Sequence, residues 1–388
     1  MIEGWATAFE METALPTAAA ALPIFADRLA GRPNPGVLPF ARFDEKEELV
    51  RQWHGLEARA LMPTQSHAFA SALSSTLLAK AAIQVFFVRI GGDVSALLAL
   101  SRRRGRFARW TTVGAHEVCE PYDALCRDAE AARLLAELIA RDGRALEMDR
   151  IPAGSLLIPA LRAAMRGKAW MTVRPAIPTP TIALDACWKD PASCFNSGRR
   201  SDFRRAARRA SELGEVSFEI RSPSPAEFDA LFDEAVRVEL RSWKREAGTA
   251  IAVDRAKESC FRDYFRSACE EGKFRIAFMR IDGRAVAMQM ALECLDRYWL
   301  FKIGFDEEYG RCSPGSLLML HTIGWAAARE LRAYELLGNV EPWIARFWTR
   351  EQHDCLCVRA YPFNAAGAVA FAADAWAWLR RRLAPARV

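Results

Sequence analysis

Hydrophobic and polar positions along this chain repeat one order of patterns twice. FFVRIGGDVSALLAL (residues 86–100) and AFMRIDGRAVAMQMAL (residues 277–292) each contain two apolar runs that flank a turn with glycine, and Arg-Ile precedes the turn in both. Two such runs around a short glycine turn predict a β-hairpin. The chain therefore contains two similar predicted hairpins, far apart in the sequence.

The similarity continues downstream of both hairpins. ARWTTVG, which ends at Gly114, and WLFKIG, which ends at Gly304, each predict a third strand. Residues 130–148 and 316–336 then each predict a helix that is followed by a short strand of the form Arg-Ala-x-Glu. We interpret the two copies as an internal duplication of a unit with the order hairpin, strand, helix, strand. This order predicts an α/β (α+β) fold with two tandem lobes, each a mixed β-sheet flanked by helices.

A proline-rich stretch at residues 173–184 lies between the two copies and suits a linker or an edge strand. We expect an N-terminal extension at residues 1–40, a first lobe at 41–184 and a second lobe at 185–362. The remaining residues, 363–388, predict an amphipathic helix with a basic end. This helix either docks on a lobe or contacts a membrane surface.

Composition places the chain among globular proteins: of its 388 residues, 51% are hydrophobic and 26% are charged. No run reaches the roughly 20 apolar residues that cross a membrane. Glu3, Glu10 and Glu12 stand where a signal peptide carries positive charge, so we expect a cytoplasmic protein. His353, Cys355 and Cys357 alternate as in a packed strand and lack a second ligand pair, so we expect no metal.

The net charge of +6 is unevenly distributed. Residues 199–209 contain six arginines within about three helical turns. Such a helix either meets phosphates of a nucleic acid, a cofactor or a lipid, or is simply a solvated surface.

The stretch YGRCSPGSLL, residues 309–318, joins a predicted strand to a predicted helix. Ser313 can cap the helix and Pro314 suits its first turn. The free backbone N–H groups and the positive dipole end of such a helix can hold a phosphate, and Gly315 and Ser316 allow a close approach. The equivalent connection in the first copy, after Gly114, is longer and acidic. We therefore expect one phosphate site, in the second lobe.

These segments resemble the GCN5-related N-acetyltransferase (GNAT) superfamily and, within it, the CelD/BcsL-type acetyltransferase family that is associated with bacterial cellulose biosynthesis. The chain is also similar to the FemABX aminoacyl transferases, which share a twin-lobe plan. The segments that carry the resemblance are residues 199–209, 241–244, 274–292, 300–318 and 336–348.

The resemblance implies a direct transfer of an acyl group, expected to be acetyl, from acyl-CoA to an amine or hydroxyl of a small-molecule, polysaccharide or peptide acceptor. It assigns pantetheine to the strand 301–305 and the pyrophosphate to the turn 311–316. Pro314 and Ser316 stand where the superfamily loop has glycines, and proline has no N–H to donate. The cofactor-binding candidates are Phe301, Ile303, Phe305, Arg311, Cys312, Ser313, Gly315 and Ser316.

Two alternatives stay open. A FemABX-like enzyme would use aminoacyl-tRNA, which is the one nucleic acid retained as a partner. A catalytically degenerate GNAT-like module would bind without transfer.

Acyl transfer needs a base for the nucleophile and an acid for the thiolate, and it needs no metal. Our candidates are Glu341 as base and Tyr309 as acid. Ile344 stands where the CelD/BcsL-type subgroup is expected to have lysine. The substrate-binding candidates are Trp243, Lys302, Asp306, Trp343 and Arg346.

Overall fold

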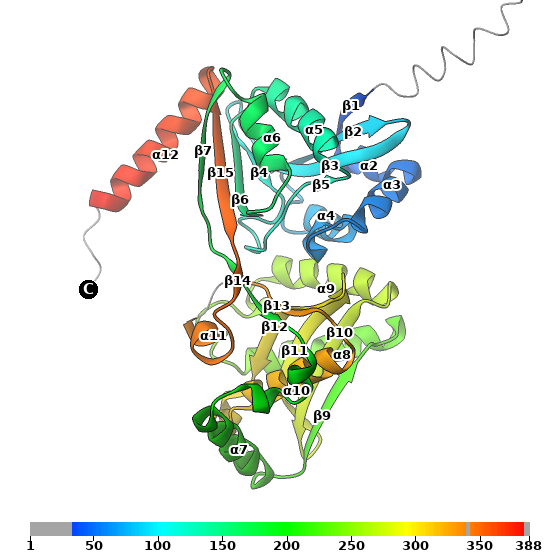
Figure 1. The fold of residues 1–388 in the computed structure, drawn as a ribbon, viewed down its shortest axis with the longest axis vertical. Coiled ribbons are helices and arrows are strands. Elements are labelled where there is room, and N and C mark those ends of the chain that lie inside the picture. The colour runs from blue at the N-terminus through cyan, green and yellow to red at the C-terminus, as the bar shows by residue number, and fades with distance from the viewer. Residues whose placement is uncertain (1–32, 339–341, 384–388) are drawn as a thin grey trace, which may run out of the picture.

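The computed structural model describes residues 33–338 and 342–383, and these residues form two mixed sheets in two stacked lobes (Figure 1). The eight-stranded first sheet has the order β1-β2-β3-β4-β6-β15-β7, with β5 beside β3. Its strands are β1 (Asn34–Pro39), β2 (Ala82–Ile90), β3 (Asp93–Arg102), β4 (Trp110–Thr112), β5 (Leu125–Cys126), β6 (Leu146–Pro152), β7 (Ala169–Pro175) and β15 (Cys355–Pro362).

The seven-stranded second sheet has the order β14-β8-β13-β12-β11-β10-β9. Its strands are β8 (Thr179–Ala183), β9 (Val216–Arg221), β10 (Phe274–Ile281), β11 (Arg284–Cys294), β12 (Arg297–Phe305), β13 (Ala333–Leu336) and β14 (Gln352–His353).

Helices cover both sheets, as expected for this fold class (Figure 1). The first-lobe helices are α2 (Phe40–Asp44), α3 (Glu47–Glu57), α4 (His67–Ser75), α5 (Ala129–Asp142) and α6 (Leu157–Ala164). The second-lobe helices are α7 (Ser197–Ser211), α8 (Pro225–Leu240), α9 (Arg255–Glu270), α10 (Pro314–Ala328) and α11 (Pro342–Phe347); α12 (Ala365–Leu383) follows β15. Short 3₁₀ turns are η2 (Pro63–Gln65), η3 (Ala186–Lys189), η4 (Pro191–Cys194), η5 (Ile251–Val253) and η6 (Glu307–Cys312).

The predicted duplication is present in the topology. The order β2-β3-β4-α5-β6 in the first lobe corresponds to β10-β11-β12-α10-β13 in the second, and both β4–β6 and β12–β13 pair in parallel. Both hairpins also shift register just before the Arg-Ile pair, between Val88 and Arg89 and between Met279 and Arg280. The repeated Arg-Ile therefore marks a repeated irregularity in the strand pairing.

Two strands cross the boundary expected at residue 184. β8, in the proline-rich stretch, pairs with β13 and belongs to the second sheet, whereas β15 lies between β6 and β7 of the first. All four residues of β13 are buried, so its outer edge needs a partner strand, and β8 supplies it. The two lobes therefore exchange strands.

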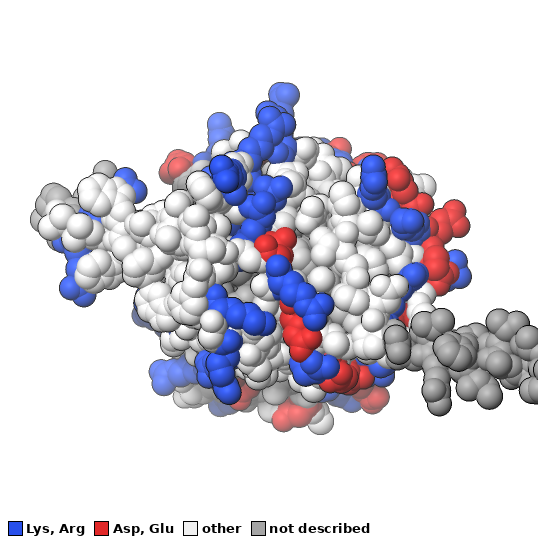
Figure 2. Space-filling view, turned by 90° about the horizontal axis from the view of Figure 1, so that it is seen from above, with Lys and Arg blue, Asp and Glu red and all other residues white. Residues whose placement is uncertain are grey.

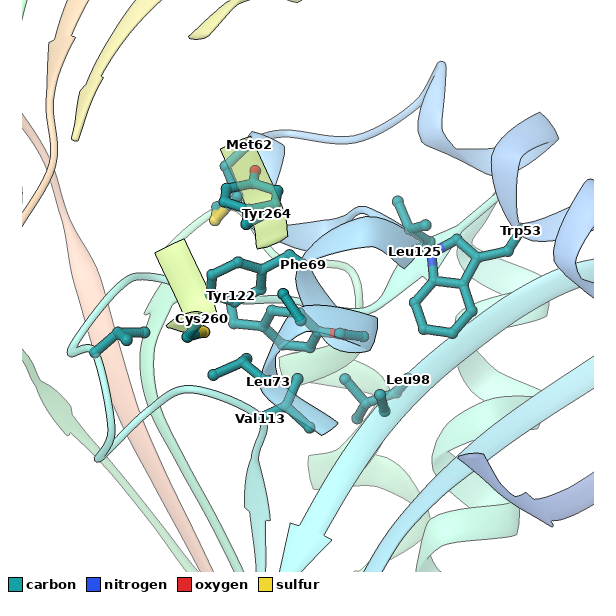
Figure 3. Packing of buried hydrophobic residues seen from close by; sticks show 14 of the residues in the cluster. Trp53, Met62, Phe69, Leu73, Leu98, Val113, Tyr122, Leu125, Cys260 and Tyr264 are labelled. Atoms are coloured by element: carbon teal, nitrogen blue, oxygen red, sulfur yellow. The ribbon is translucent and has the colours of Figure 1, made fainter. Parts of the chain in front are cut away.

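A shared apolar core joins the lobes where α4 faces α9. The rings of Phe69 and Tyr264 meet edge to face with centroids 5.1 Å apart, and the Tyr264 hydroxyl donates to the Pro63 carbonyl at 3.0 Å. Tyr122 and Cys260 lie in the same cluster (Figure 3). Residues of both lobes thus form one continuous hydrophobic cluster.

The predicted C-terminal helix is α12, and its first half docks on the first lobe. The Asp374 carboxylate accepts from Arg109 at 2.8 Å and from the Tyr361 hydroxyl at 2.7 Å. Its second half projects from the lobe, where Trp376 and Trp378 are 60% and 54% exposed (Figures 1 and 2). None of the helices in the described part of the chain has the length and apolar character to span a membrane.

Candidate active site

The second sheet opens where β12 parts from β13. The two strands pair from Arg297 to Leu300, and the last link is the Leu337 N–H, which donates to the Leu300 carbonyl at 3.1 Å. Beyond this point β12 continues to Phe305 on β11 alone, and an extra β12 residue, Phe301, bulges out of the β11–β12 register. We call the edge of β12 at residues 301–305, which lies beyond the pairing with β13, the opening.

The backbone of Ile303 faces this opening. The Asp306 N–H donates to the Val286 carbonyl at 2.8 Å, which fixes the β11–β12 hydrogen-bond alternation and directs the Ile303 N–H and C=O away from β11. The Lys244 ammonium donates to the Ile303 carbonyl at 2.6 Å and lies 3.3 Å from the buried Glu239 carboxylate. An ammonium group thus lines the opening beside polar backbone groups.

The predicted strand–turn–helix follows β12 directly. Ser313 has a left-handed conformation (φ 49°) without a side-chain capping bond, so the predicted cap is replaced by a backbone turn. Its carbonyl accepts from the N–H groups of Ser316 at 3.0 Å and Leu317 at 3.2 Å, and Pro314 has no N–H. A side chain at Gly315 would meet its nearest neighbour, Phe305, at an ordinary 3.4 Å. Gly315 therefore tolerates a small side chain, and only a large one would crowd the turn.

The basic helix α7 lies against this turn. Arg209 donates to the Arg311 carbonyl at 3.2 Å, and both side chains are exposed. To an anion this turn offers the Gly315 N–H, the positive end of α10 and nearby guanidinium groups, with fewer backbone donors than a glycine-rich loop provides.

The Asp306 side chain forms ion pairs at the start of the turn. Its carboxylate is 3% exposed and contacts Arg241 at 2.6 Å and Arg284 at 2.8 Å. The Arg284 guanidinium also covers the Tyr309 ring, 5.3 Å from its centroid. Asp306 and Tyr309 thus lie at the β11 side of the turn, and the roles predicted for them in substrate binding and proton transfer stay predictions.

Lys302 points to the α9 side of β12. Its ammonium lies 4.1 Å from the centre of the Phe261 ring. Burial lowers the pKa of Lys302, and the carboxylates of Glu120 and Glu239 oppose that shift. Lys302 therefore lies among charged groups from both lobes.

The other predicted residues divide between packing and exposure. Glu341 lies outside the described residues. Ile344 is 4% exposed and packs in a cluster with Trp348, while Trp343 packs at the edge of that cluster. Trp243 is 40% exposed. The burial of Ile344 explains an apolar side chain there.

Two further predicted residues are buried, and a third is exposed. Phe301 is buried against Tyr264 and Phe265 of α9, and Cys312 is buried under the turn. The exposed Arg346 lies with its guanidinium 5.1 Å from the Phe347 ring centroid. For Phe301, the main chain and not the ring is what a ligand in the opening can reach.

Glu120, which was not predicted, reaches the opening from the first lobe. It is 2% exposed, and its Oε2 accepts from the Gly338 N–H at 3.0 Å. Gly338 directly follows Leu337, which makes the last link between β12 and β13. The sequence marks this connection only as longer and acidic than its counterpart in the second lobe. Glu120 and Gly338 lie 218 residues apart in the chain, so no local pattern links them.

Residues 197–343 match the family model of the acetyltransferase (GNAT) domain. This GNAT-type domain contains the opening, the turn and α10. Together with the duplicated topology, the match makes the fold a tandem pair of GNAT-like lobes. No curated protein matches the chain.

Solved structures with the same two-lobe fold span most of the chain. FemX has 10% identity and a TM-score of 0.54, covering 81% of this chain and 96% of its own. A conserved protein of unknown function from Bacteroides thetaiotaomicron has 10% identity and a TM-score of 0.52, with coverages of 80% and 97%. The C-terminal domain of a putative lysylphosphatidylglycerol synthetase from Agrobacterium fabrum has 14% identity and a TM-score of 0.50, with coverages of 84% and 94%. At these identities the similarity concerns the fold.

Proposed function

We propose that the protein is an acyl-CoA-dependent acyltransferase of the GNAT type that transfers an acyl group, expected to be acetyl, directly to an amine or hydroxyl of its acceptor. The observation that carries the proposal is the opening beside β12, where the Ile303 N–H and C=O point away from β11 and the strand leads straight into the turn before α10. A pantetheine arm can pair with that edge, and the turn can hold its diphosphate. The cytoplasmic location and the CelD/BcsL-type assignment belong to the same proposal.

Different residues would bind the charged and the uncharged parts of acyl-CoA. Arg209 and Arg311 offer guanidinium groups to the diphosphate, and the Ile303 main chain offers a donor and an acceptor to the amide groups of pantetheine. Lys244 donates to the Ile303 carbonyl at 2.6 Å, and the second lone pair of that oxygen can accept from a bound ligand. Bound acyl-CoA would supply the activated thioester.

Calorimetric titration with acetyl-CoA tests the proposal. Gly315→Trp should abolish binding because the indole would fill the approach to the turn, whereas Gly315→Ala should bind like the wild type because its methyl meets Phe305 at an ordinary contact distance. Saturable binding that Gly315→Trp alone removes would support the proposal. No binding of acetyl-CoA or longer acyl-CoAs to the wild type would refute it.

The exposed arginines of α7 support a second candidate, a transferase that uses aminoacyl-tRNA. Five guanidinium side chains on this helix are exposed, and Arg209 contacts the turn, so a polyanion could continue from the turn along α7. They are Arg200, Arg204, Arg205, Arg208 and Arg209. Tight tRNA binding that weakens steeply with salt, in a protein that does not bind acyl-CoA, would favour this candidate.

A further inference from the structure

A carboxylate from the first lobe lies at the point where β12 and β13 part, which we call the vertex of the opening. The Glu120 side chain contacts the Gly338 N–H at 3.0 Å, one residue beyond the last hydrogen bond between β12 and β13. Among the described residues, this is the one hydrogen bond that the carboxylate accepts. Burying a carboxylate that is 2% exposed and accepts so few hydrogen bonds lowers the free energy of unfolding. Buried ionisable groups of this kind cluster at functional sites.

The loop that carries Glu120 is held in place by buried polar groups. Arg150, itself 3% exposed, donates to the Cys119 carbonyl, and the Thr64 hydroxyl donates to the Pro121 carbonyl at 2.5 Å. The Gln65 side chain donates to the Ala124 carbonyl at 2.9 Å. These bonds anchor the loop to the first lobe on both sides of Glu120.

Charged groups from three elements face Glu120. Burial is the largest influence and raises its pKa. Lys302 of β12, Arg150 of β6, the Gly338 N–H and Lys257 of α9 lower it, in decreasing order of effect. The net effect is a raised pKa, which brings the carboxyl closer to the range that suits a general base at neutral pH.

We propose that the acceptor is a primary amine that enters the opening from the first-lobe side, and that Glu120 binds its ammonium group and acts as the general base. This inference rests on the proposed acyl-CoA-dependent function. An ammonium supplies the positive charge that a buried carboxylate needs, whereas a hydroxyl does not. The vertex, where Glu120 lies, is also the end of the opening farthest along β12 from the phosphate turn.

The proposed proton transfers balance. Glu120 takes one proton from the ammonium, and the nitrogen lone pair then forms the N–C bond to the thioester carbonyl. The C–S bond breaks, its electron pair stays on the CoA sulfur, and the sulfur takes up the second proton lost by the nitrogen. The proton on Glu120 leaves to solvent, so the products are an amide, CoA thiol and one released proton.

The test compares Glu120→Gln with Glu117→Gln. The glutamine keeps an oxygen acceptor for the Gly338 N–H but cannot take a proton, and Glu117 is a neighbouring, partly exposed glutamate of the same loop. Thiol release from acetyl-CoA is followed with a panel of primary amines that includes diamines, polyamines, amino sugars and lysine, and with the matching alcohols. Acetyl-CoA affinity is measured by calorimetry for each variant.

The expected result is turnover with an amine and not with its alcohol. Glu120→Gln should lower kcat by about 100-fold or more and remove the acidic limb of the pH profile, while acetyl-CoA affinity stays within about twofold of wild type. Glu117→Gln should retain both the rate and the profile.

Each other outcome has a separate meaning. A wild type that does not bind acetyl-CoA refutes the proposed function itself. A wild type that binds acetyl-CoA but turns over alcohols only, or no amine of the panel, overturns the inference and leaves the cofactor proposal standing. An unchanged kcat and pH profile in Glu120→Gln also overturns it. Unchanged acetyl-CoA affinity in the variant shows that a loss of rate does not come from misfolding.

Discussion

The buried carboxylate of Asp123 should make the protein less stable as the pH rises towards neutrality. Asp123 is 4% exposed and follows Glu120 by three residues on the same loop. It accepts from the Ser155 hydroxyl at 2.8 Å and from the Ala124 N–H at 2.8 Å, and burial outweighs these bonds and raises its pKa to about 7. Replacing it with asparagine removes the charge and keeps an acceptor oxygen.

The size of this loss of stability follows from the increase in the pKa of Asp123. An increase from 3.8 to about 7 means that the folded state binds the proton more tightly than the unfolded state by at most about 4 kcal/mol. This contribution is fully present below pH of about 4 and is lost as the pH rises through about 7. Between pH 5 and 8 the wild type should therefore lose roughly 2 to 3 kcal/mol that Asp123→Asn does not lose.

Urea unfolding at pH 5, 6.5 and 8 measures the difference. The free energy of unfolding of Asp123→Asn relative to wild type should rise by that roughly 2 to 3 kcal/mol across the range, whatever constant offset the amide introduces. Asp93→Asn, at the exposed first residue of β3, should follow the wild-type pH dependence. Parallel pH profiles for Asp123→Asn and wild type would refute the reasoning, because they would show that Asp123 titrates alike in both states.

Three further predictions concern other contacts. Tyr264→Phe should lower the free energy of unfolding by about 1 kcal/mol in urea titrations, because it removes the hydroxyl bond to the first lobe; an unchanged value would show that this bond does not stabilise the lobe contact. Lys244→Met should lower the free energy of unfolding by about 2 to 3 kcal/mol, because it leaves the Glu239 carboxylate buried without its cation. Adding Glu239→Gln to the same chain should recover part of this loss, and strictly additive effects of the two substitutions would contradict an interaction between the two side chains. Mild oxidation should join Cys187 and Cys194, whose sulfurs lie 2.6 Å apart, and thiol titration should then find two fewer thiols, as it should not in Cys187→Ser.

The sequence predicted the parts of the fold that depend on nearby residues. Alternation over Phe86–Leu100 and Ala277–Leu292 located both hairpins, and helical spacing after Ser316 located α10. It did not predict that β8 and β15 exchange between the sheets. Alternation shows which face of a strand is buried, but the partner of a strand is set by edges that form only when both sheets assemble.

The same limit applies to the site. The turn before α10 is contiguous in sequence, so its residues could be named in advance, although Ser313 holds it by backbone geometry and not by its side chain. The paired Asp306 and the buried Ile344 have partners that are remote in sequence, so their packing could not be predicted. Glu120 is the strongest case, because its neighbours Gly338 and Lys302 belong to the other lobe.

The duplication gives a physical reason why the first lobe supplies Glu120. In each copy the third strand leaves its parallel partner early: β12 parts from β13 after Leu300, and β4 pairs with β6 at two residues only, Trp110 and Thr111. In the second lobe the connection that follows forms the turn before α10. In the first lobe the equivalent connection crosses to the second lobe and places Glu120 at the vertex. Two equivalent connections thus meet at one opening, so a substitution at Glu120 in the first lobe should alter the chemistry proposed for the second lobe.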